Sequence, residues 1–405
     1  MPRVLRILNR FNLGGPTYNA AYLTKYLEPE FETMLIGGDN DETEENSEYI
    51  VRSLGIIPFT IPEMKRSINP YYDIIAYRKI RDIIKRFRPH IVHTHASKAG
   101  ALGRRAASYM KVPVIIHTFH GHVFDAYFSS IKSSFYVNIE RQLAKKSTRI
   151  IALSEIQKEE LAKKYKICKP EKIEVIPLGF DLDKFQENMD FKRESFRKDY
   201  NIAYDEIAIG IIGRIVPIKN HIMFIEALKY ILERTDKKIR VFIIGDGTEK
   251  TNIELKAKEL GISYLEGNYK NEKAIITFTS WIKNIDYAIS GMDIIALTSL
   301  NEGTPVSLIE AQAANKPIVT TDVGGIKNVV IPNQTAFISP NGDAEKFGEN
   351  MLKLLDDDNL RAVFGKSGAD FVRKKYHYTC LVNNMKNLYL SLLKENADKI
   401  NQHKK

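Results

Sequence analysis

Short runs of apolar, β-branched residues alternate with helix-periodic segments along most of this chain, and this alternation constrains the fold more than any other feature. Helical periodicity is clear at residues 17–27, 72–87 and 222–232. Strand–helix alternation indicates parallel sheets covered by helices on both faces, so we predict an α/β protein with two doubly wound sheets. The predicted strands are residues 4–8, 33–36, 91–94, 114–118, 149–153 and 174–177 in a first series, and 207–212, 240–244, 275–278, 294–297 and 317–320 in a second.

The length of 405 residues also favours two domains over one. The break lies near P-L-G-F-D-L-D-K-F, residues 177–185, which precedes a polar, charge-rich stretch at 186–201. We therefore predict one domain over 1–180 and a second over 181–375. Ligands bind beyond the carboxyl ends of parallel strands, so we expect the working site in a cleft between two facing sheets.

The composition favours a cytoplasmic protein. Hydrophobic residues make up 44% and charged residues 27%, which is ordinary for a soluble globular chain. The two cysteines, Cys168 and Cys380, provide neither a disulfide framework nor a C-x-x-C metal site. No apolar run reaches the roughly 20 residues that span a bilayer. The opening M-P-R-V-L-R-I-L-N-R predicts a strand and not a secretory leader.

The formal charge of +10 is concentrated in one region. Residues 65–149 hold 17 Lys and Arg against four acids. Such a region suits nucleic acid, an anionic membrane or a phosphorylated substrate, and a soluble basic surface without a partner is the alternative. Aromatic and cationic residues interleave at 126–146, so one hypothesis is peripheral docking on an anionic cytoplasmic leaflet. An ordinary amphipathic helix packed on the sheet is the other interpretation.

Two features of the first domain are candidates for ligand contacts. Gly14 and Gly15 follow the first predicted strand and precede a helix, where backbone N–H groups can approach a phosphate. Six of the nine histidines fall within 33 residues, and all of these except His90 lie at the ends of two successive strands. We expect polar side chains facing a cleft there rather than a metal site, because no H-E-x-x-H or cysteine accompanies them. We assign His120 to the cleft and treat His90 and His117 as core residues. The six are His90, His93, His95, His117, His120 and His122.

The second domain places cations and glycines after its strands. G-I-I-G-R-I-V-P-I-K puts Gly213, Arg214 and Lys219 just beyond a strand, where two cations suit an anionic leaving group such as a diphosphate. Two solvated surface cations are the alternative. The next strand ends in F-I-I-G-D-G, where Gly245 and Gly247 permit a close backbone approach.

The stretch N-E-G-T-P-V-S-L-I-E-A-Q-A-A-N-K-P, residues 301–317, carries two acids. Pro305 suits a first helical turn, so we predict a helix over 304–314, closed by Asn315 in the left-handed conformation. Gly303 and Thr304 then offer free N–H groups at the positive end of the helix. Glu302 precedes this helix and Glu310 lies within it. A first-turn acid followed by a solvated acid is the alternative interpretation.

These elements together resemble one family in order and spacing across essentially the whole chain. They are the Glu-x₇-Glu stretch, G-R before a lysine, the Gly-Gly loop, H-G-H and T-D-V-G-G-I, and the block E-G-T-P-V-S-L-I-E-A-Q-A-A-N-K-P-I-V is the most specific. The family is the retaining glycosyltransferases of glycosyltransferase family 4. It has the GT-B fold, with two Rossmann-like domains facing across a cleft.

The resemblance implies roles for the motif residues. The second domain would bind a nucleotide-diphosphate sugar, expected to be UDP-linked. Arg214 and Lys219 would hold the departing diphosphate, and Glu310 would bind ribose hydroxyls. His120 would contact the sugar from the first domain. Catalysis would rest on stabilisation of the leaving group. The anomeric configuration would be retained by front-face transfer, without a carboxylate nucleophile. The remaining expected donor contacts are Gly14, Gly15, Gly213, Gly245, Glu302, Gly303, Thr304, Pro305 and Val306.

The resemblance also implies what the chain does not need. D-L-D at 181–183 aligns with an interdomain segment of the family, so we predict neither a metal nor another cofactor. The helix at 376–393 is expected to cross back onto the first domain, making 376–405 a third segment. Asn315 and Asn328 stand where the family commonly has Gly and Glu, and the second exchange puts any polar role of that loop in doubt.

The expected partners follow from the same resemblance. Residues 93–105 resemble family members that build bacterial surface polysaccharides, which suggests a glycan or polyprenyl-linked acceptor for a hexosyl transfer. Another GT-B sugar-nucleotide enzyme, such as an epimerase or a phosphorylase, is the chief alternative. A nucleic-acid-binding protein is the second, but the sequence has no recognisable nucleic-acid module, so we expect no nucleic-acid partner.

Overall fold

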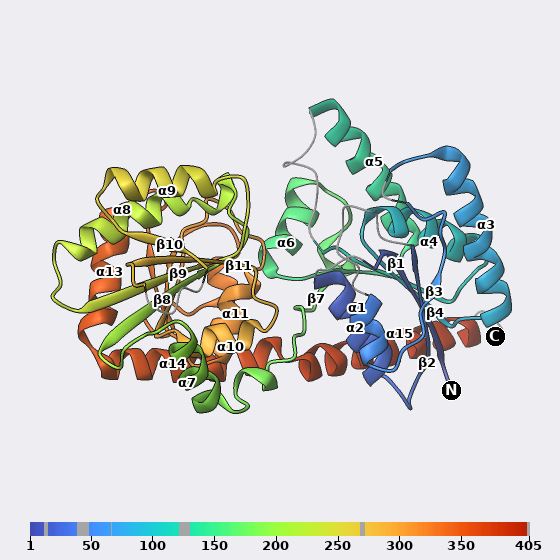
Figure 1. The fold of residues 1–405 in the computed structure, drawn as a ribbon. Helices are drawn as coiled ribbons and strands as arrows, with labels where there is room; N and C mark the ends of the chain where they lie inside the picture. The colour runs from blue at the N-terminus through green and yellow to red at the C-terminus, as the bar shows by residue number, and fades with distance from the viewer. Residues whose placement is uncertain (12–14, 39–47, 66, 121–129, 268–271, 403–405) are drawn as a thin grey trace. The chain divides into compact units, whose positions relative to one another are not determined.

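The fold is described from a computed structural model of the chain (Figure 1). The structure describes residues 1–11, 15–38, 48–65, 67–120, 130–267 and 272–402. Two compact units divide the chain. Unit 1 comprises Met1–Phe180 and Tyr376–Lys405, and unit 2 comprises Asp181–Lys375.

Unit 1 is built on a seven-stranded sheet with the order β3-β2-β1-β4-β5-β6-β7. Every neighbouring pair is parallel, and helices follow the strands in sequence, as the alternation predicted. The strands are β1(Arg3–Arg10), β2(Glu32–Gly38), β3(Phe59–Thr60), β4(Ile91–His95), β5(Val114–Thr118), β6(Arg149–Ala152) and β7(Ile173–Val175). The helices are α1(Gly15–Tyr26), α2(Glu48–Ser53), α3(Pro70–Phe87), α4(Ser97–Tyr109), α5(Ser130–Lys146), α6(Glu155–Glu159), the π-helix η1(Glu160–Lys164), η2(Pro170–Lys172) and α15(Tyr378–Gln402).

The last helix, α15, packs into the core of unit 1 (Figure 1). Its side chains Leu381, Met385 and Tyr389 are buried beside Leu23 and Phe31. Gly179 lets the chain pass close to this helix, because a Cβ there would lie 2.8 Å from the Cβ of Leu381. The C-terminal helix is therefore part of the hydrophobic core that supports the first sheet.

Unit 2 repeats the design with a second seven-stranded sheet, β10-β11-β9-β8-β12-β13-β14, again parallel throughout. The strands are β8(Glu206–Ile212), β9(Lys238–Ile244), β10(Tyr264–Glu266), β11(Ile276–Ser280), β12(Ile294–Leu297), β13(Ile318–Thr321) and β14(Ala336–Ser339). The helices are η3(Asp183–Phe185), α7(Met189–Asp199), η4(Pro217–Lys219), α8(His221–Leu232), α9(Lys250–Glu259), α10(Ile285–Gly291), α11(Val306–Ala313), α12(Ile326–Val329), α13(Ala344–Asp356) and α14(Asp358–Tyr376).

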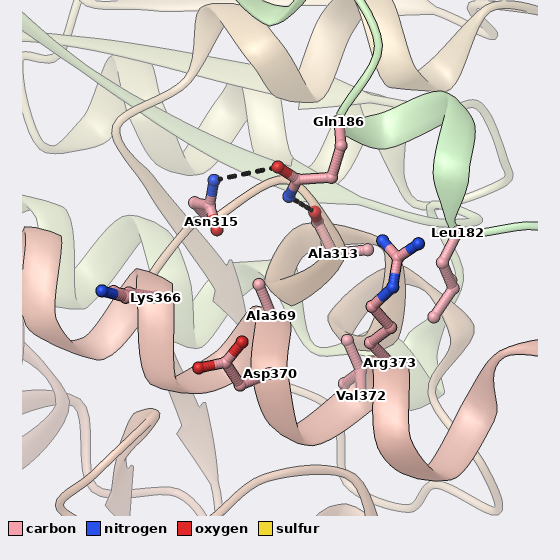
Figure 2. A pocket seen from close by; sticks show the side chains of 9 residues that line it. All are labelled: Leu182, Gln186, Ala313, Asn315, Lys366, Ala369, Asp370, Val372 and Arg373. Carbon is pink, nitrogen blue, oxygen red and sulfur yellow. Dashed lines mark hydrogen bonds between the residues drawn. The ribbon is translucent and has the colours of Figure 1, made fainter.

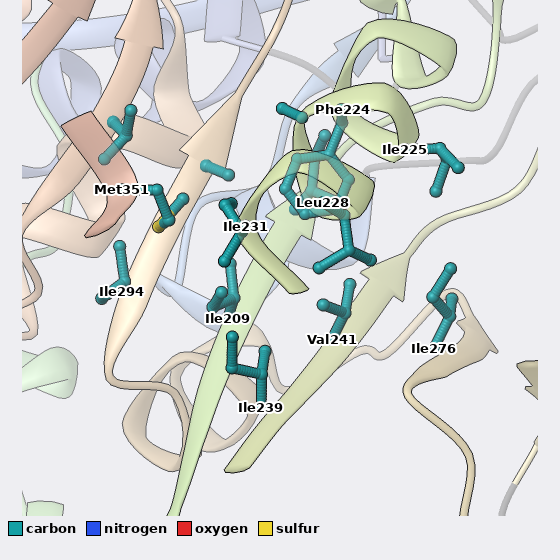
Figure 3. Close-up of a cluster of buried hydrophobic side chains, with 14 of the residues drawn as sticks. Ile209, Phe224, Ile225, Leu228, Ile231, Ile239, Val241, Ile276, Ile294 and Met351 are labelled. Atoms are coloured by element: carbon teal, nitrogen blue, oxygen red, sulfur yellow. The ribbon is translucent and has the colours of Figure 1, made fainter. Parts of the chain in front are cut away.

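The core of unit 2 lies between this sheet and its helices (Figure 3). Ile209 and Val241 project from β8 and β9 against Phe224 and Leu228 of α8, and all four side chains are fully buried. Because the strands are short, apolar and covered, the parallel ladder is shielded from water. A firmly packed sheet holds the loops at its strand ends in place. Among the described residues, no helix combines the length and apolar character that crossing a bilayer requires.

A buried ion pair joins two helices of unit 1. Nη2 of Arg104 in α4 lies 2.7 Å from Oε2 of Glu140 in α5, and Nε of the same guanidinium donates to the Gly100 carbonyl at 2.8 Å. The two charged side chains are almost fully shielded from solvent. A charge buried this deeply is tolerated only beside its counter-ion.

Glu140→Ala should therefore destabilise the protein strongly, by about 3–5 kcal/mol, because it leaves the Arg104 guanidinium buried without a partner. Urea denaturation followed by circular dichroism measures the effect. Glu159→Ala is the matched control, since it removes the carboxylate of the exposed Lys163–Glu159 pair. It should leave the transition midpoint almost unchanged. Equal effects of the two substitutions would contradict the assigned role of the buried pair.

Candidate functional site

Several loops of unit 2 leave the sheet at the edge where the carboxyl ends of the parallel strands lie, called here the carboxyl edge. The loop after β8 carries Gly213 and Arg214, and the loop after β9 carries Gly245. The loop after β12 carries Glu302. In open α/β sheets this edge is where ligands bind, so the predicted donor residues of unit 2 come from the expected position in the fold.

Glycines allow the loops after β8 and β9 to pack backbone against backbone. Gly245 has φ 146°, and a Cβ there would lie 2.0 Å from the Gly213 carbonyl oxygen. A Cβ on Gly247 would lie 2.2 Å from the Ile215 carbonyl oxygen. No side chain fits at either position without moving a loop. The close approach that these glycines permit is therefore to the neighbouring loop.

Lys219 forms an ion pair at the same edge. Its ammonium nitrogen lies 2.5 Å from Oε1 of Glu302, and the Ser299 hydroxyl donates to the same oxygen at 2.6 Å. The Thr298 hydroxyl donates to the carbonyl oxygen of Lys219 at 3.1 Å, which fixes the turn that carries this lysine. The side chain of Arg214 is exposed and has no ion pair within the described parts of the chain. Sequence reasoning missed Ser299, although it lies only three residues before Glu302.

The helix after Glu302 starts later than predicted. It spans Val306–Ala313, and Pro305 is its N-cap, with φ −71° and ψ 99° and no side-chain capping bond. The prediction of a start at Thr304 was wrong by two residues because the loop is held outside the helix by other contacts. The Gly325 N–H donates to the Glu302 carbonyl at 2.8 Å, and a Cβ on Gly325 would lie 1.7 Å from the Gly303 carbonyl oxygen.

The two acids of the Glu-x₇-Glu stretch have different surroundings. Glu302 is held by Lys219 and Ser299. Glu310 is half-buried in α11, which packs against α10 and η3. Burial raises the pKa of Glu310 to about 7, with Lys184 opposing this shift and Asp286 adding to it. Among the described residues, the two carboxylates therefore have no partner in common.

The other end of α11 adjoins a cavity of about 260 Å³ (Figure 2). Asn315 has φ 56°, which confirms the predicted left-handed cap, and its Nδ2 donates to Oε1 of Gln186 at 3.4 Å. None of the predicted donor residues that the structure describes lines this cavity. Its lining residues are Leu182, Gln186, Ala313, Asn315, Lys366, Ala369, Asp370, Val372 and Arg373.

Histidines gather at the carboxyl edge of unit 1, as the sequence indicated, but His93 and His95 are fully buried and do not face a cleft. His93 contacts the Tyr389 hydroxyl through Nδ1 at 2.6 Å, and Nδ1 of His95 lies 2.9 Å from Nε2 of His120. Burial lowers the pKa of His93 and His95 far below the usual range, and that of His120 to about 3. These imidazoles are neutral at physiological pH.

The remaining predicted residues of unit 1 are also accounted for. His117 is buried as expected and lies 2.9 Å from the Thr94 hydroxyl through Nδ1. His90 is not a core residue: it is half-buried, and its Nδ1 accepts the Arg3 N–H at 3.0 Å. Gly15 is the first residue of α1. Gly14 and His122 lie outside the described residues. Among those that the structure does describe, no group of three His, Cys, Asp or Glu side chains could hold a metal ion.

Comparison with known proteins assigns the family. Residues 13–184 match the family model described as Glycosyltransferase Family 4, and residues 192–371 match Glycosyl transferases group 1. The chain is 30% identical over 340 residues to the Escherichia coli UDP-Gal:alpha-D-GlcNAc-diphosphoundecaprenol alpha-1,3-galactosyltransferase, covering 83% of this chain and 84% of that protein. It is 28% identical over 350 residues to the capsular polysaccharide biosynthesis glycosyltransferase CapM of Staphylococcus aureus, covering 85% and 87%.

A solved structure agrees with the fold. The crystal structure of Anabaena HepE in complex with UDP matches with a TM-score of 0.78 and 16% identity, covering 96% of this chain and all of that one. The GT-B fold predicted from the sequence is thereby confirmed. The chain belongs to glycosyltransferase family 4.

Proposed function

We propose that this glycosyltransferase transfers a hexosyl residue from a UDP-linked sugar to a lipid-linked or glycan acceptor in surface polysaccharide biosynthesis, with retention of anomeric configuration. The printed names of two relatives support the substrates, since one uses UDP-Gal with a diphosphoundecaprenol acceptor and the other acts in capsular polysaccharide biosynthesis. The UDP complex of a protein with the same fold supports the choice of nucleotide.

The observation that carries this proposal is the Lys219–Glu302 pair beside the uncapped start of α11. A lysine ammonium is held at 2.5 Å from a carboxylate, and the first N–H groups of the nearby helix lack a side-chain cap. A cation and the positive end of a helix at one sheet edge suit a diphosphate. Arg214, exposed and without an ion pair among the described residues, adds a second cation.

In the proposed reaction the bond between the anomeric carbon and the diphosphate oxygen breaks, and the acceptor oxygen bonds to the same face of the sugar. The departing diphosphate oxygen takes the proton of the acceptor hydroxyl, so atoms and charge balance without a protein nucleophile. Arg214 and Lys219 stabilise the charge that develops on the diphosphate, so the step needs no metal ion in this scheme. Positioning of the two substrates provides the rest of the acceleration.

The other site residues have binding roles in this proposal. Glu310 binds ribose hydroxyls, and Glu302 contacts the donor sugar while orienting the Lys219 ammonium. His120 offers a neutral imidazole to a sugar hydroxyl. The remaining residues are proposed to contact the donor, and Val306 is the first residue of α11. These remaining residues are Gly14, Gly15, Gly213, Gly245, Gly303, Thr304 and Pro305.

We further propose that unit 1 docks on an anionic membrane through the first turns of α3. Ile68, which precedes the helix, and Tyr71 and Ile74 within it are 68%, 69% and 52% exposed. Exposed cations Arg78 and Lys85 continue the same helix face. This combination suits the headgroup region of a bilayer. Helix α5 lies within residues 126–146, the stretch for which the sequence suggested membrane docking, and it buries part of its apolar surface in the core.

Lys219→Ala and Glu310→Ala should each remove most sugar transfer. The loss for Lys219→Ala should reach about 10²–10³-fold in kcat, because charge on the departing diphosphate is no longer neutralised. Nucleotide release from UDP-sugars in the presence of a lipid-linked acceptor measures the rate. Lys346→Ala, which removes an exposed lysine paired with Glu349, is the control. Near-normal rates in both site variants would refute the site assignment.

The ionisation of Glu310 should appear in the pH dependence of the protein's stability. Its pKa rises from an ordinary 4.5 to about 7 on folding, so the folded chain keeps a proton that the unfolded chain releases between these values. The free energy of unfolding should therefore fall as pH rises through this window. Glu310→Gln should remove about 1–3 kcal/mol of that fall. Urea denaturation at about pH 5 and about pH 8 measures it. The exposed substitution Glu345→Gln should leave the fall as in the parent, and an unaltered fall in Glu310→Gln would contradict the assignment.

Membrane docking is tested by flotation with phosphatidylglycerol vesicles. The parent protein should float with them at low salt, and binding should weaken as salt screens the cations. Replacing Tyr71 and Ile74 by Ser should reduce the bound fraction severalfold, because the apolar contacts are lost. Val363→Ser, an equally exposed apolar position in unit 2, should have no effect. No flotation at low salt would exclude this surface as a membrane site.

A further inference from the structure

A cavity of about 590 Å³ lies at the edge of the unit 1 sheet where the strands begin, and it is called here the amino-edge cavity. Its walls come from the end of α5, the start of β6 and the loop that leads through η2 into β7. Pockets that hold small molecules typically have volumes of this order. The amino-edge cavity is therefore large enough for a small-molecule ligand.

This cavity is separate from the residues of unit 1 that are proposed to contact the sugar donor. Every neighbouring pair in the sheet is parallel, so the amino ends of the strands lie at one edge and the carboxyl ends at the other. His120 follows the carboxyl end of β5, whereas the cavity lies at the amino ends of β6 and β7. A strand as long as β5 spans about 15 Å. A ligand in this cavity would leave the proposed donor site free.

The lining of the amino-edge cavity is strongly basic. Its cations are Lys145, Arg149, Lys169 and Lys172, and its one acid is Glu171. The three lysine ammonium groups form no ion pair with any residue that the structure describes. The lining therefore has an excess of three positive charges, which suits an anion that carries several negative charges, such as a diphosphate.

The nearby acids leave most of this charge uncompensated. Nη2 of Arg149 lies 3.7 Å from Oε1 of Glu395 in α15, and both side chains are partly exposed to solvent. An ion pair this long and this exposed contributes little free energy. Glu171 is exposed and forms no ion pair within the described part of the chain. An incoming anion can therefore bind the Arg149 guanidinium at little cost.

The remaining lining is partly apolar and adds no negative charge. Ala144 and Ile167 are buried in the core of unit 1, and Cys168 packs beside them. Burial raises the pKa of the Cys168 thiol, with Lys172 opposing this shift, so the thiol is neutral at physiological pH. None of the exposed large apolar side chains among the described residues lines the cavity. It therefore lacks the projecting apolar anchors of a surface that inserts into a bilayer.

We propose that the amino-edge cavity binds a small, soluble phosphorylated molecule through Arg149, Lys169 and Lys172, as an anion site separate from the donor site. Guanidinium and ammonium groups are the side chains that bind phosphate oxygens in proteins. A lipid headgroup has the same chemistry, but the cavity offers no exposed apolar side chain beside its cations for the lipid surface. The proposal concerns binding alone and does not depend on the proposed function.

Cys168 provides a reporter within the cavity. Iodoacetamide alkylates its thiolate, and Cys380→Ser makes it the only cysteine of the chain. Inorganic diphosphate should slow this alkylation, because the anion covers the thiol and raises its pKa further. At about ten times the dissociation constant of diphosphate, the alkylation rate should fall about tenfold. Equal protection by sodium sulfate at the same ionic strength would indicate screening in place of a site and would overturn the proposal.

Substitutions with opposite expected effects test the role of charge, each measured as the alkylation rate with and without diphosphate. Arg149→Gln and Lys172→Gln should each weaken diphosphate binding about tenfold, because a charged hydrogen bond is lost. Glu171→Gln and Glu395→Gln should each strengthen it about twofold, because a competing carboxylate is removed. Lys146→Gln, at an exposed lysine outside the lining, is the control and should leave binding almost unchanged.

If Arg149→Gln or Lys172→Gln does not fold, the protection of the parent and the gain in Glu171→Gln still decide the proposal. Lys219→Ala, in the donor site, should retain the protection of Cys168 by diphosphate. Loss of protection in this variant would overturn the separation of the two sites. If the proposed function fails, no UDP-sugar is turned over, but diphosphate still protects Cys168.

Vesicles distinguish the two sources of phosphate. Phosphatidylglycerol and phosphatidylcholine vesicles should leave the alkylation of Cys168 equally fast, because no headgroup enters the cavity. Protection by phosphatidylglycerol vesicles without protection by free diphosphate would assign the cavity to a lipid headgroup and overturn the proposal of a soluble ligand. Alkylation at the same rate with and without diphosphate, at any concentration tested, would also overturn it.

Discussion

Backbone-to-backbone contact between loops at the carboxyl edge of unit 2 is the constraint on which the candidate donor site depends. A Cβ on Gly245 would lie 2.0 Å from one loop carbonyl, and a Cβ on Gly325 would lie 1.7 Å from another. These contacts fix the paths of the loops that carry Arg214 and Glu302. Because main-chain contacts restrict these loops, little backbone entropy remains to be lost when a ligand binds.

In unit 1, side chains at the carboxyl edge are held in position by a buried polar network and not by packed loops. Tyr389 comes from the last helix, and its hydroxyl fills the position from which the His93 ring is oriented. The hydrophobic burial of α15 therefore does more than stabilise the core, because it places the Tyr389 hydroxyl where both Arg6 and His93 contact it. A polar network this deep is favourable only when its members are satisfied, and among the described residues its unsatisfied nitrogens are Nε of Arg6, Nε2 of His95 and Nδ1 of His120.

Much of the fold could be predicted from the sequence, because strand–helix alternation and the length of the apolar runs report local burial. The prediction missed β3, β10 and β14, which have two to four residues and pair on one side only. Such short edge strands bury too little to leave an apolar run. The histidines were predicted as a cluster, but the burial of His93 could not be predicted, since its ring contacts Tyr389 of the C-terminal helix. The sequence predicted a close backbone approach at Gly245 and Gly247, but it did not show that the approaching group is another loop.

The two acids of residues 301–317 show most clearly where sequence spacing loses its predictive power. Spacing in the sequence sets roughly how far apart two side chains can lie, but the surroundings of each depend on groups brought near by the fold. Glu302 is paired with Lys219, which is 83 residues away in sequence, and this pair keeps a carboxylate beside a cation. Glu310 is half-buried, and the influence of Lys184 does not offset its desolvation. A motif with two chemically identical residues therefore contains one acid that orients a cation and another that can gain a proton near neutral pH. That difference arises from tertiary packing alone.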